Sequence, residues 1–99
     1  MSSKLFKAFD QHRQEIRDIV RKYNALNPRI FGSVLHGCDT DESDLDILVD
    51  RVPHVTTFMS IGGIKAEIEE MLHVSVDVLT PDGLPEKFRN EVLQEAMPV

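Results

Sequence analysis

The stretch from Phe31 to Asp50, FGSVLHGCDTDESDLDILVD, constrains the fold more than any other part of the chain. It places a Gly32-Ser33 turn shortly before an apolar segment that carries two carboxylates, Asp44 and Asp46. Side chains alternate along a strand, so acids two residues apart lie on one face of a sheet. Two such charges repel each other, and a divalent cation relieves that repulsion. The spacing therefore predicts a cation site on a strand.

The glycine turn predicts what the cation would hold. Glycine allows backbone N–H groups to approach a ligand closely, and the free N–H groups at the start of a helix attract phosphate. The segment 34–36 is long enough for about one helical turn, and Gly37 can end that turn in a left-handed conformation. Ser33 adds a hydroxyl donor at the same place, and Ser43 lies at the entrance of the acidic strand. A phosphate site next to paired carboxylates indicates nucleotide chemistry.

The combined pattern resembles a known family. Gly32-Ser33, Gly37 and Ser43-Asp44-Leu45-Asp46-Ile47 together resemble the signature of the minimal nucleotidyltransferases of the DNA polymerase β superfamily. In that family a later strand supplies a third carboxylate, and Asp77 in Val74-Ser75-Val76-Asp77-Val78-Leu79-Thr80-Pro81 fits that position. His36 stands where the family commonly has arginine. The resemblance covers the chain from about Ile30 to Val99 and implies a polymerase β-like fold with a mixed sheet.

The resemblance also implies roles for the site residues. Asp44, Asp46 and Asp77 would be the catalytic carboxylates and would hold two Mg²⁺ ions. Gly32, Ser33 and Ser43 would bind the nucleotide and its phosphates. The substrate would be ATP or another NTP, and the reaction would move a nucleoside monophosphate, AMP foremost, onto a hydroxyl group.

Small proteins of this kind are often antitoxins of HEPN-type ribonuclease toxins, so the resemblance implies a HEPN-type toxin as the partner and acceptor. The alternative is a non-catalytic antitoxin, a binding module that neutralises its partner by contact. The three carboxylates favour chemistry, because a pure binding protein has no need of them. A small-molecule transferase of the aminoglycoside-modifying type is a third reading, for which the chain is short.

Size and charge limit the substrates. At 99 residues, positions 1–99 are expected to form one minimal nucleotidyltransferase domain, without room for a template-binding module. The formal net charge of −6 opposes binding to long nucleic acids, whose affinity comes from phosphate neutralisation. Cys38 is the single cysteine, and the sequence has no long apolar run or signal peptide. We therefore expect a cytoplasmic protein that binds neither membrane nor long nucleic acid.

Hydrophobic periodicity predicts an α/β fold, a single small domain with a short sheet flanked by helices. Ser3 is expected to cap the first helix, and Gly62-Gly63 indicates either a late start of the second long helix or a close contact beneath the sheet. The predicted elements are helices at 3–26, 57–72 and 85–96, strands at 29–31, 45–49 and 74–79, and a helical turn at 34–36.

Several other polar residues are possible ligands by type alone. Asp39, Asp41 and Glu42 are predicted to belong to a solvated loop, because they lack the rigid geometry of a strand. His36 and Cys38 are too few for a zinc site. Phe88 and Val92, on the apolar side of the last helix, are interpreted as core residues, with a docking surface as the alternative.

Overall fold

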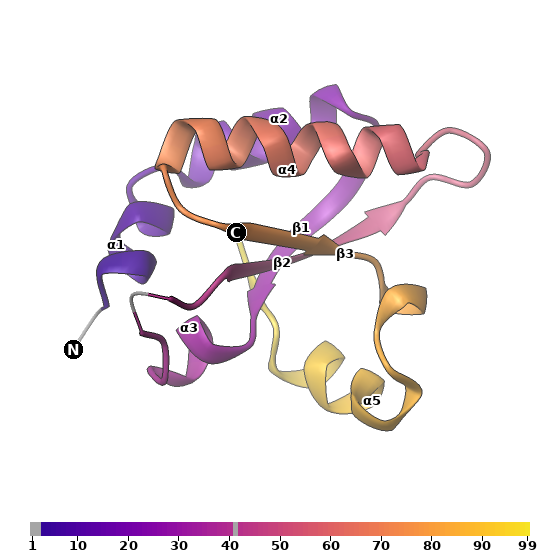
Figure 1. Ribbon diagram of the computed structural model, residues 1–99. Helices are drawn as coiled ribbons and strands as arrows, with labels where there is room; N and C mark the ends of the chain where they lie inside the picture. The colour runs from indigo at the N-terminus through magenta and orange to yellow at the C-terminus, as the bar shows by residue number, and fades with distance from the viewer. Residues whose placement is uncertain (1–2, 41) are drawn as a thin grey trace.

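The computed structural model describes residues 3–40 and 42–99, and a four-stranded mixed sheet lies at its centre (Figure 1). The strands are β1 (Ala25–Phe31), β2 (Leu45–Arg51), β3 (Val76–Leu79) and β4 (Met97–Pro98), in the order β3-β2-β1-β4. The pairs β1·β2 and β1·β4 are antiparallel, whereas β2·β3 is parallel. The predicted small α/β fold with a mixed sheet is confirmed.

One face of the sheet carries the main hydrophobic core. Helices α1 (Lys4–Asp10), α2 (Arg13–Lys22) and α4 (Phe58–Leu72) pack on this face. Leu45, Ile47 and Val49 of β2 point to this face and are fully buried here, whereas Asp46 and Leu48 point to the other face. The core includes Phe9, Ile16, Val20, Ile30, Ile64, Ile68 and Val76.

The opposite face is covered only in part. Phe31, Leu48 and Leu84 form a second, smaller cluster there, with Val92 and Ala96 packed against it. Helix α5 (Glu86–Glu95) and the 3₁₀ turn η1 (Pro81–Gly83) bring that cover, and the short helix α3 (Ser33–His36) lies at the end of β1. Phe31 pairs with Asp46, so the candidate carboxylates emerge on this less covered face.

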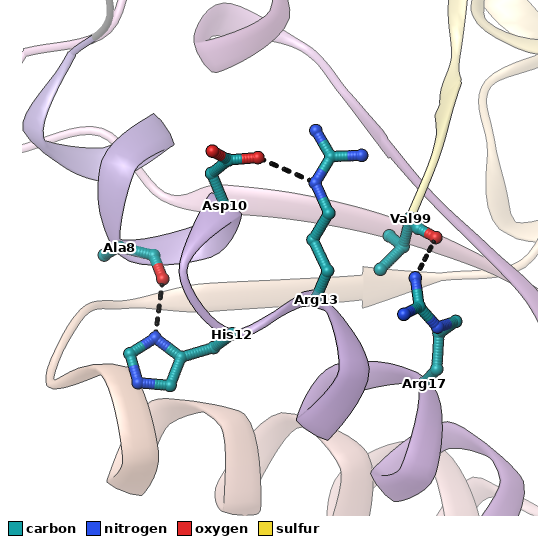
Figure 2. A network of polar contacts seen from close by, with 6 residues as sticks. All are labelled: Ala8, Asp10, His12, Arg13, Arg17 and Val99. Carbon is teal, nitrogen blue, oxygen red and sulfur yellow. Dashed lines mark hydrogen bonds and ion pairs between the residues drawn. The ribbon is translucent and has the colours of Figure 1, made fainter.

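The prediction of one helix from Ser3 to Leu26 was wrong, because the chain turns between α1 and α2 (Figure 2). The Ser3 cap is confirmed, since its hydroxyl oxygen accepts a 2.9 Å hydrogen bond from the Phe6 N–H. At the turn, His12 Nδ1 donates to the carbonyl oxygen of Ala8 at 2.9 Å. Arg13 pairs with Asp10 across the break at 2.8 Å. These local side-chain bonds replace the helical bonds that periodicity predicted.

Helix α2 also ends earlier than predicted. Strand β1 begins at Ala25 and not at Arg29, because Asn24 adopts a left-handed conformation with φ of 61°. Asparagine tolerates this conformation better than most residues, so it can stop a helix. Leu26, the last residue of the predicted helix 3–26, instead lies on β1 and is 54% exposed.

Helix α4 matches its prediction and explains the two glycines. Thr57 and Ser60 form a reciprocal capping box, so the helix starts at Phe58 and the late-start reading was wrong. A Cβ atom at Gly63 would overlap with the ring of Tyr23, which caps the C-terminal end of α2, whereas one at Gly62 would meet open space. The close contact is therefore made with the neighbouring helix and not with the sheet.

The C-terminal region adds a strand that the sequence did not predict. Helix α5 lies within the predicted 85–96 range, but Met97 and Pro98 then pair with Ile30 and Arg29. Arg17 of α2 donates to the carbonyl oxygen of Val99 at 2.7 Å (Figure 2). Val92 packs against the smaller cluster, whereas Phe88 is 48% exposed, so the core interpretation holds for Val92 alone.

Within residues 3–40 and 42–99, no helix combines the length and apolar character needed to cross a membrane.

Candidate active site

Strands β2 and β3 bring two of the predicted carboxylates side by side. Asp46 and Asp77 are paired residues in the parallel register, so their side chains emerge on the same face of the sheet. Asp44 immediately precedes β2, two residues before Asp46, and is exposed. Asp46 is half-buried and Asp77 is exposed. The predicted third strand at 74–79 is shorter than expected, because β3 begins at Val76 and Ser75 lies outside it.

The electrostatics of Asp46 reflect this convergence. The pKa of the Asp46 carboxyl is raised from 3.8 to about 6, first by burial and then by the negative charges of Asp77 and Asp44. Burial acts first because the charged form loses solvation, and each like charge then disfavours ionisation. Asp46 is therefore the centre of the acidic group, in electrostatic contact with both other carboxylates.

Gly32 forms the wall next to Asp46. Its φ is +80°, a conformation that residues with a Cβ rarely adopt. A Cβ atom placed at this position would overlap with Oδ2 of Asp46 and lie 3.2 Å from its Cγ. The backbone of the glycine turn thus touches a candidate metal ligand directly.

The turn after Gly32 has the predicted form. Helix α3 spans Ser33 to His36, and Gly37 ends it in a left-handed conformation with φ of 69°. The first residues of a helix have N–H groups without an intrahelical acceptor, so Ser33 and Val34 present theirs at the start of α3. Among the hydrogen bonds of the described residues, none occupies the Ser33 hydroxyl group. Gly32, next to Asp46, therefore leads directly into the start of α3 at Ser33.

Ser43 lies in a different setting from Gly32 and Ser33. Its hydroxyl oxygen accepts a 2.8 Å hydrogen bond from the Thr40 N–H and so stabilises the loop that leads into β2. It also lines a cleft of about 720 Å³ between α1 and the 72–75 segment, together with Asp39 and Glu42. Asp41, predicted as a loop residue, lies outside the described residues.

In two contacts at the edge of the site, the partners Glu95 and Lys65 are residues that the sequence pattern did not mark. His36 Nε2 lies 2.9 Å from Glu95 Oε2, which connects α3 with α5. Lys65 Nζ lies 3.9 Å from Oδ1 of Asp77. Nothing local in the sequence marks Glu95, whereas the Lys65 and Glu69 spacing of four on a helix was a usable signal for a charged pair.

Metal binding can be assessed from the donors themselves. Within the described ranges, no three His, Cys, Asp or Glu side chains lie close enough together to form a ready-made cation site. The oxygen donors Asp44, Asp46 and Asp77 nevertheless fit Mg²⁺, which is usually held by one or two carboxylates and completed by water and phosphate oxygens. The raised pKa of Asp46 has the sign expected of carboxylates that lack a counter-charge.

Comparison with known proteins identifies the fold. The family described as "Polymerase beta, Nucleotidyltransferase" matches residues 14–99. The chain belongs to this nucleotidyltransferase family. A relative from Methanocaldococcus jannaschii, MJ0435, is named provisionally as a protein adenylyltransferase and is 31% identical over 87 residues, 88% of this chain and 92% of that protein.

Solved structures agree with the nucleotidyltransferase assignment. One, described provisionally as a minimal nucleotidyltransferase, has a TM-score of 0.83 and 31% identity over 100% of this chain and 97% of that one. Another is a toxin–antitoxin with AMP-PNP, with a TM-score of 0.69 and 17% identity over 86% of this chain and 69% of that one. At that identity the second comparison shows a shared fold. The predicted family, its fold and the enzyme class are confirmed.

Proposed function

We propose that this nucleotidyltransferase transfers AMP from ATP to a hydroxyl group of a partner protein: the hydroxyl oxygen bonds the α-phosphorus, the bond to the β-phosphate breaks, and pyrophosphate leaves. The observation that carries the proposal is the meeting of Asp46 with Asp77 in register and with the backbone of Gly32. It places acidic donors beside a turn suited to phosphate. The provisional name of the 31% identical relative supports adenylyl transfer to protein.

The residues divide the work between the two substrates. Asp44, Asp46 and Asp77 would hold Mg²⁺, which supplies charge neutralisation on the phosphates and activation of the acceptor hydroxyl. Gly32 and Ser33 orient the triphosphate through backbone N–H groups and a hydroxyl donor. Ser43 fixes the loop before Asp44 through its bond to Thr40. Asp77, on the edge strand β3, faces the acceptor and can take the proton of its hydroxyl.

The charge of the chain favours a protein acceptor. Eleven basic residues against 17 acidic ones give a net charge of −6, which repels a polynucleotide outside the metal site. A docked protein holds its hydroxyl group next to the nucleotide, and the reaction becomes effectively unimolecular. We propose that the partner is a HEPN-type toxin and that this chain is its cytoplasmic antitoxin. The toxin–antitoxin that shares the fold supports an assembly of this kind.

The proposal is tested with ATP labelled at the α-phosphate, Mg²⁺ and the purified toxin, with tRNA and oligonucleotides offered in parallel. We expect label on the toxin, with no label when Asp46→Asn replaces the wild-type chain. Label that enters RNA and never enters protein contradicts the acceptor assignment. Neutralisation of the toxin by Asp46→Asn without any transfer would instead establish the binding-module alternative.

A further inference from the structure

Strand β3 is the edge of the sheet, and on its outer side the backbone groups of Val76 are bonded to side chains. Its inner side faces β2, where the Leu45 N–H donates to the carbonyl oxygen of Ser75 at 2.8 Å. The backbone groups of Val76 point the other way. Its N–H donates to Oε2 of Glu69 at 3.0 Å, and its carbonyl oxygen accepts a 2.6 Å hydrogen bond from Lys65 Nζ.

Lys65 and Glu69 act together as a substitute for a neighbouring strand. They lie one turn apart on α4, and Lys65 Nζ is 3.5 Å from Glu69 Oε2. Between them they supply the donor and the acceptor that a further strand would supply to Val76. The side chains of Lys65 and Glu69 are both partly exposed. The backbone groups of Val76 are thus bonded to these side chains at a place where water could have satisfied them instead.

The same lysine also faces the candidate active site. Its Nζ lies 3.9 Å from Oδ1 of Asp77, the residue that directly follows Val76. The two hydrogen bonds from Lys65 and Glu69 to the backbone of Val76, which we call the clamp, thus fix the strand one residue before Asp77. The ammonium group of Lys65 also attracts the Asp77 carboxylate. In the described part of the chain, the backbone at Asp77 is held only by the four-residue edge strand β3 and its pairing with β2.

We propose that Lys65, held by Glu69, is a positioning residue that fixes the Asp77 carboxylate for the transfer reaction. This inference rests on the proposed function. The pair holds β3 in register with Asp46, so the carboxylates meet the acceptor at a fixed geometry. Misplacement by about 1 Å is enough to cost an enzyme on the order of 100-fold in rate. Lys65 does not contact the NTP in this proposal, so its loss lowers kcat and leaves the KM for ATP unchanged.

The test compares Lys65→Met, Lys65→Arg and Glu69→Ala with the control Lys22→Met. Lys22 of α2 pairs with Glu67 of α4 at 2.9 Å but lies away from β3, so it controls for loss of a lysine–glutamate pair that involves α4. We expect Lys65→Met to lower kcat about 10-fold or more with KM for ATP within about two-fold, Lys65→Arg to restore most of it, and the control to stay near wild type. An equal loss in Lys22→Met, or no loss in Lys65→Met, overturns the proposal.

Amide exchange in the metal-free protein gives a readout that does not depend on transfer. Removing Glu69 or Lys65 should speed exchange of the Val76 and Asp77 amides about 10-fold while the amides of β2 keep their protection. If the wild-type chain transfers nothing, the proposed function fails, and the exchange rates still decide whether the clamp exists. Unchanged exchange in both variants overturns the clamp, whatever the activity.

Discussion

Gly32 lies so close to Asp46 that a Cβ atom at position 32 would overlap with the Asp46 carboxylate oxygen. The contact joins the phosphate turn to the acidic strand, which are 14 positions apart in the sequence. Glycine is required here twice, for its φ of +80° and for the missing side chain. A nucleotide held by the turn would therefore lie against the carboxylate that is in electrostatic contact with both other acids.

We predict that Gly32→Ala loses activity because of both effects, and Gly37→Ala is the matched control. Gly37 has a similar φ of +69°, but a Cβ there meets open space. Each variant should lose about 1–2 kcal/mol of unfolding free energy from the left-handed backbone. Gly32→Ala should also displace Asp46 and abolish transfer. Equal activities of the two variants in a transfer assay would contradict a specific contact with Asp46.

The two adjacent glycines of α4 should respond in opposite directions. Gly62→Ala replaces a helical glycine in open space and should stabilise the protein by about 0.5–1 kcal/mol. Gly63→Ala should destabilise it, because the new methyl group meets the Tyr23 ring at the C-terminal end of α2. Denaturant unfolding of the two variants measures the difference. A Gly63→Ala protein as stable as Gly62→Ala would show that α2 and α4 are less tightly packed than described.

The raised pKa of Asp46 predicts how the metal-free stability depends on pH. Between pH 4 and 6 the folded state binds more protons than the unfolded state, since the pKa of Asp46 is about 6 when folded and 3.8 otherwise. Stability therefore falls as pH rises through this window, by at most about 3 kcal/mol. Asp46→Asn should remove this fall and be the more stable protein at pH 7. Chemical unfolding in EDTA measures it, and an unchanged pH profile in the variant would refute the assignment to Asp46.

Metal binding should reverse the loss of stability that ionisation of Asp46 causes. If Asp46 holds Mg²⁺, a free ion concentration 100-fold above its Kd stabilises the folded state by about 2.7 kcal/mol. Wild-type protein should show the corresponding rise in Tm with Mg²⁺ or Mn²⁺, and removal of the ion with EDTA should reverse it. Asp46→Asn should show little rise. Equal rises in both proteins would place the ion elsewhere.

Ser33→Ala should weaken nucleotide binding without affecting the fold. No hydrogen bond among the described residues involves the Ser33 hydroxyl. Its loss should therefore leave the free energy of unfolding unchanged. A hydrogen bond to a charged phosphate contributes roughly 1.5–3 kcal/mol. Calorimetric titration with ATP and Mg²⁺ measures the change in Kd. The same substitution at Ser43 should instead loosen the loop before β2, where its oxygen accepts from Thr40.

The sequence alone determined the elements whose causes are local. The short apolar run of Leu45, Ile47, Leu48 and Val49 defines β2 as a buried strand, and Gly37 ends α3 because a left-handed residue is needed there. The three acids and the glycine turn were recognisable as a pattern of types and spacings. Even the start of α4 depends on residues within one turn, Thr57 and Ser60.

Only the tertiary structure decided where distant parts of the chain meet. The break at His12 and the strand at Met97 were missed, because the first depends on competing side-chain bonds and the second on a partner strand about 70 residues away. The register that pairs Asp46 with Asp77 is set by packing of the whole sheet. The place of Lys65 beside Asp77 likewise follows from α4 crossing from β2 to β3. Local sequence fixes which residues can do chemistry, whereas non-local pairing fixes which of them do it together.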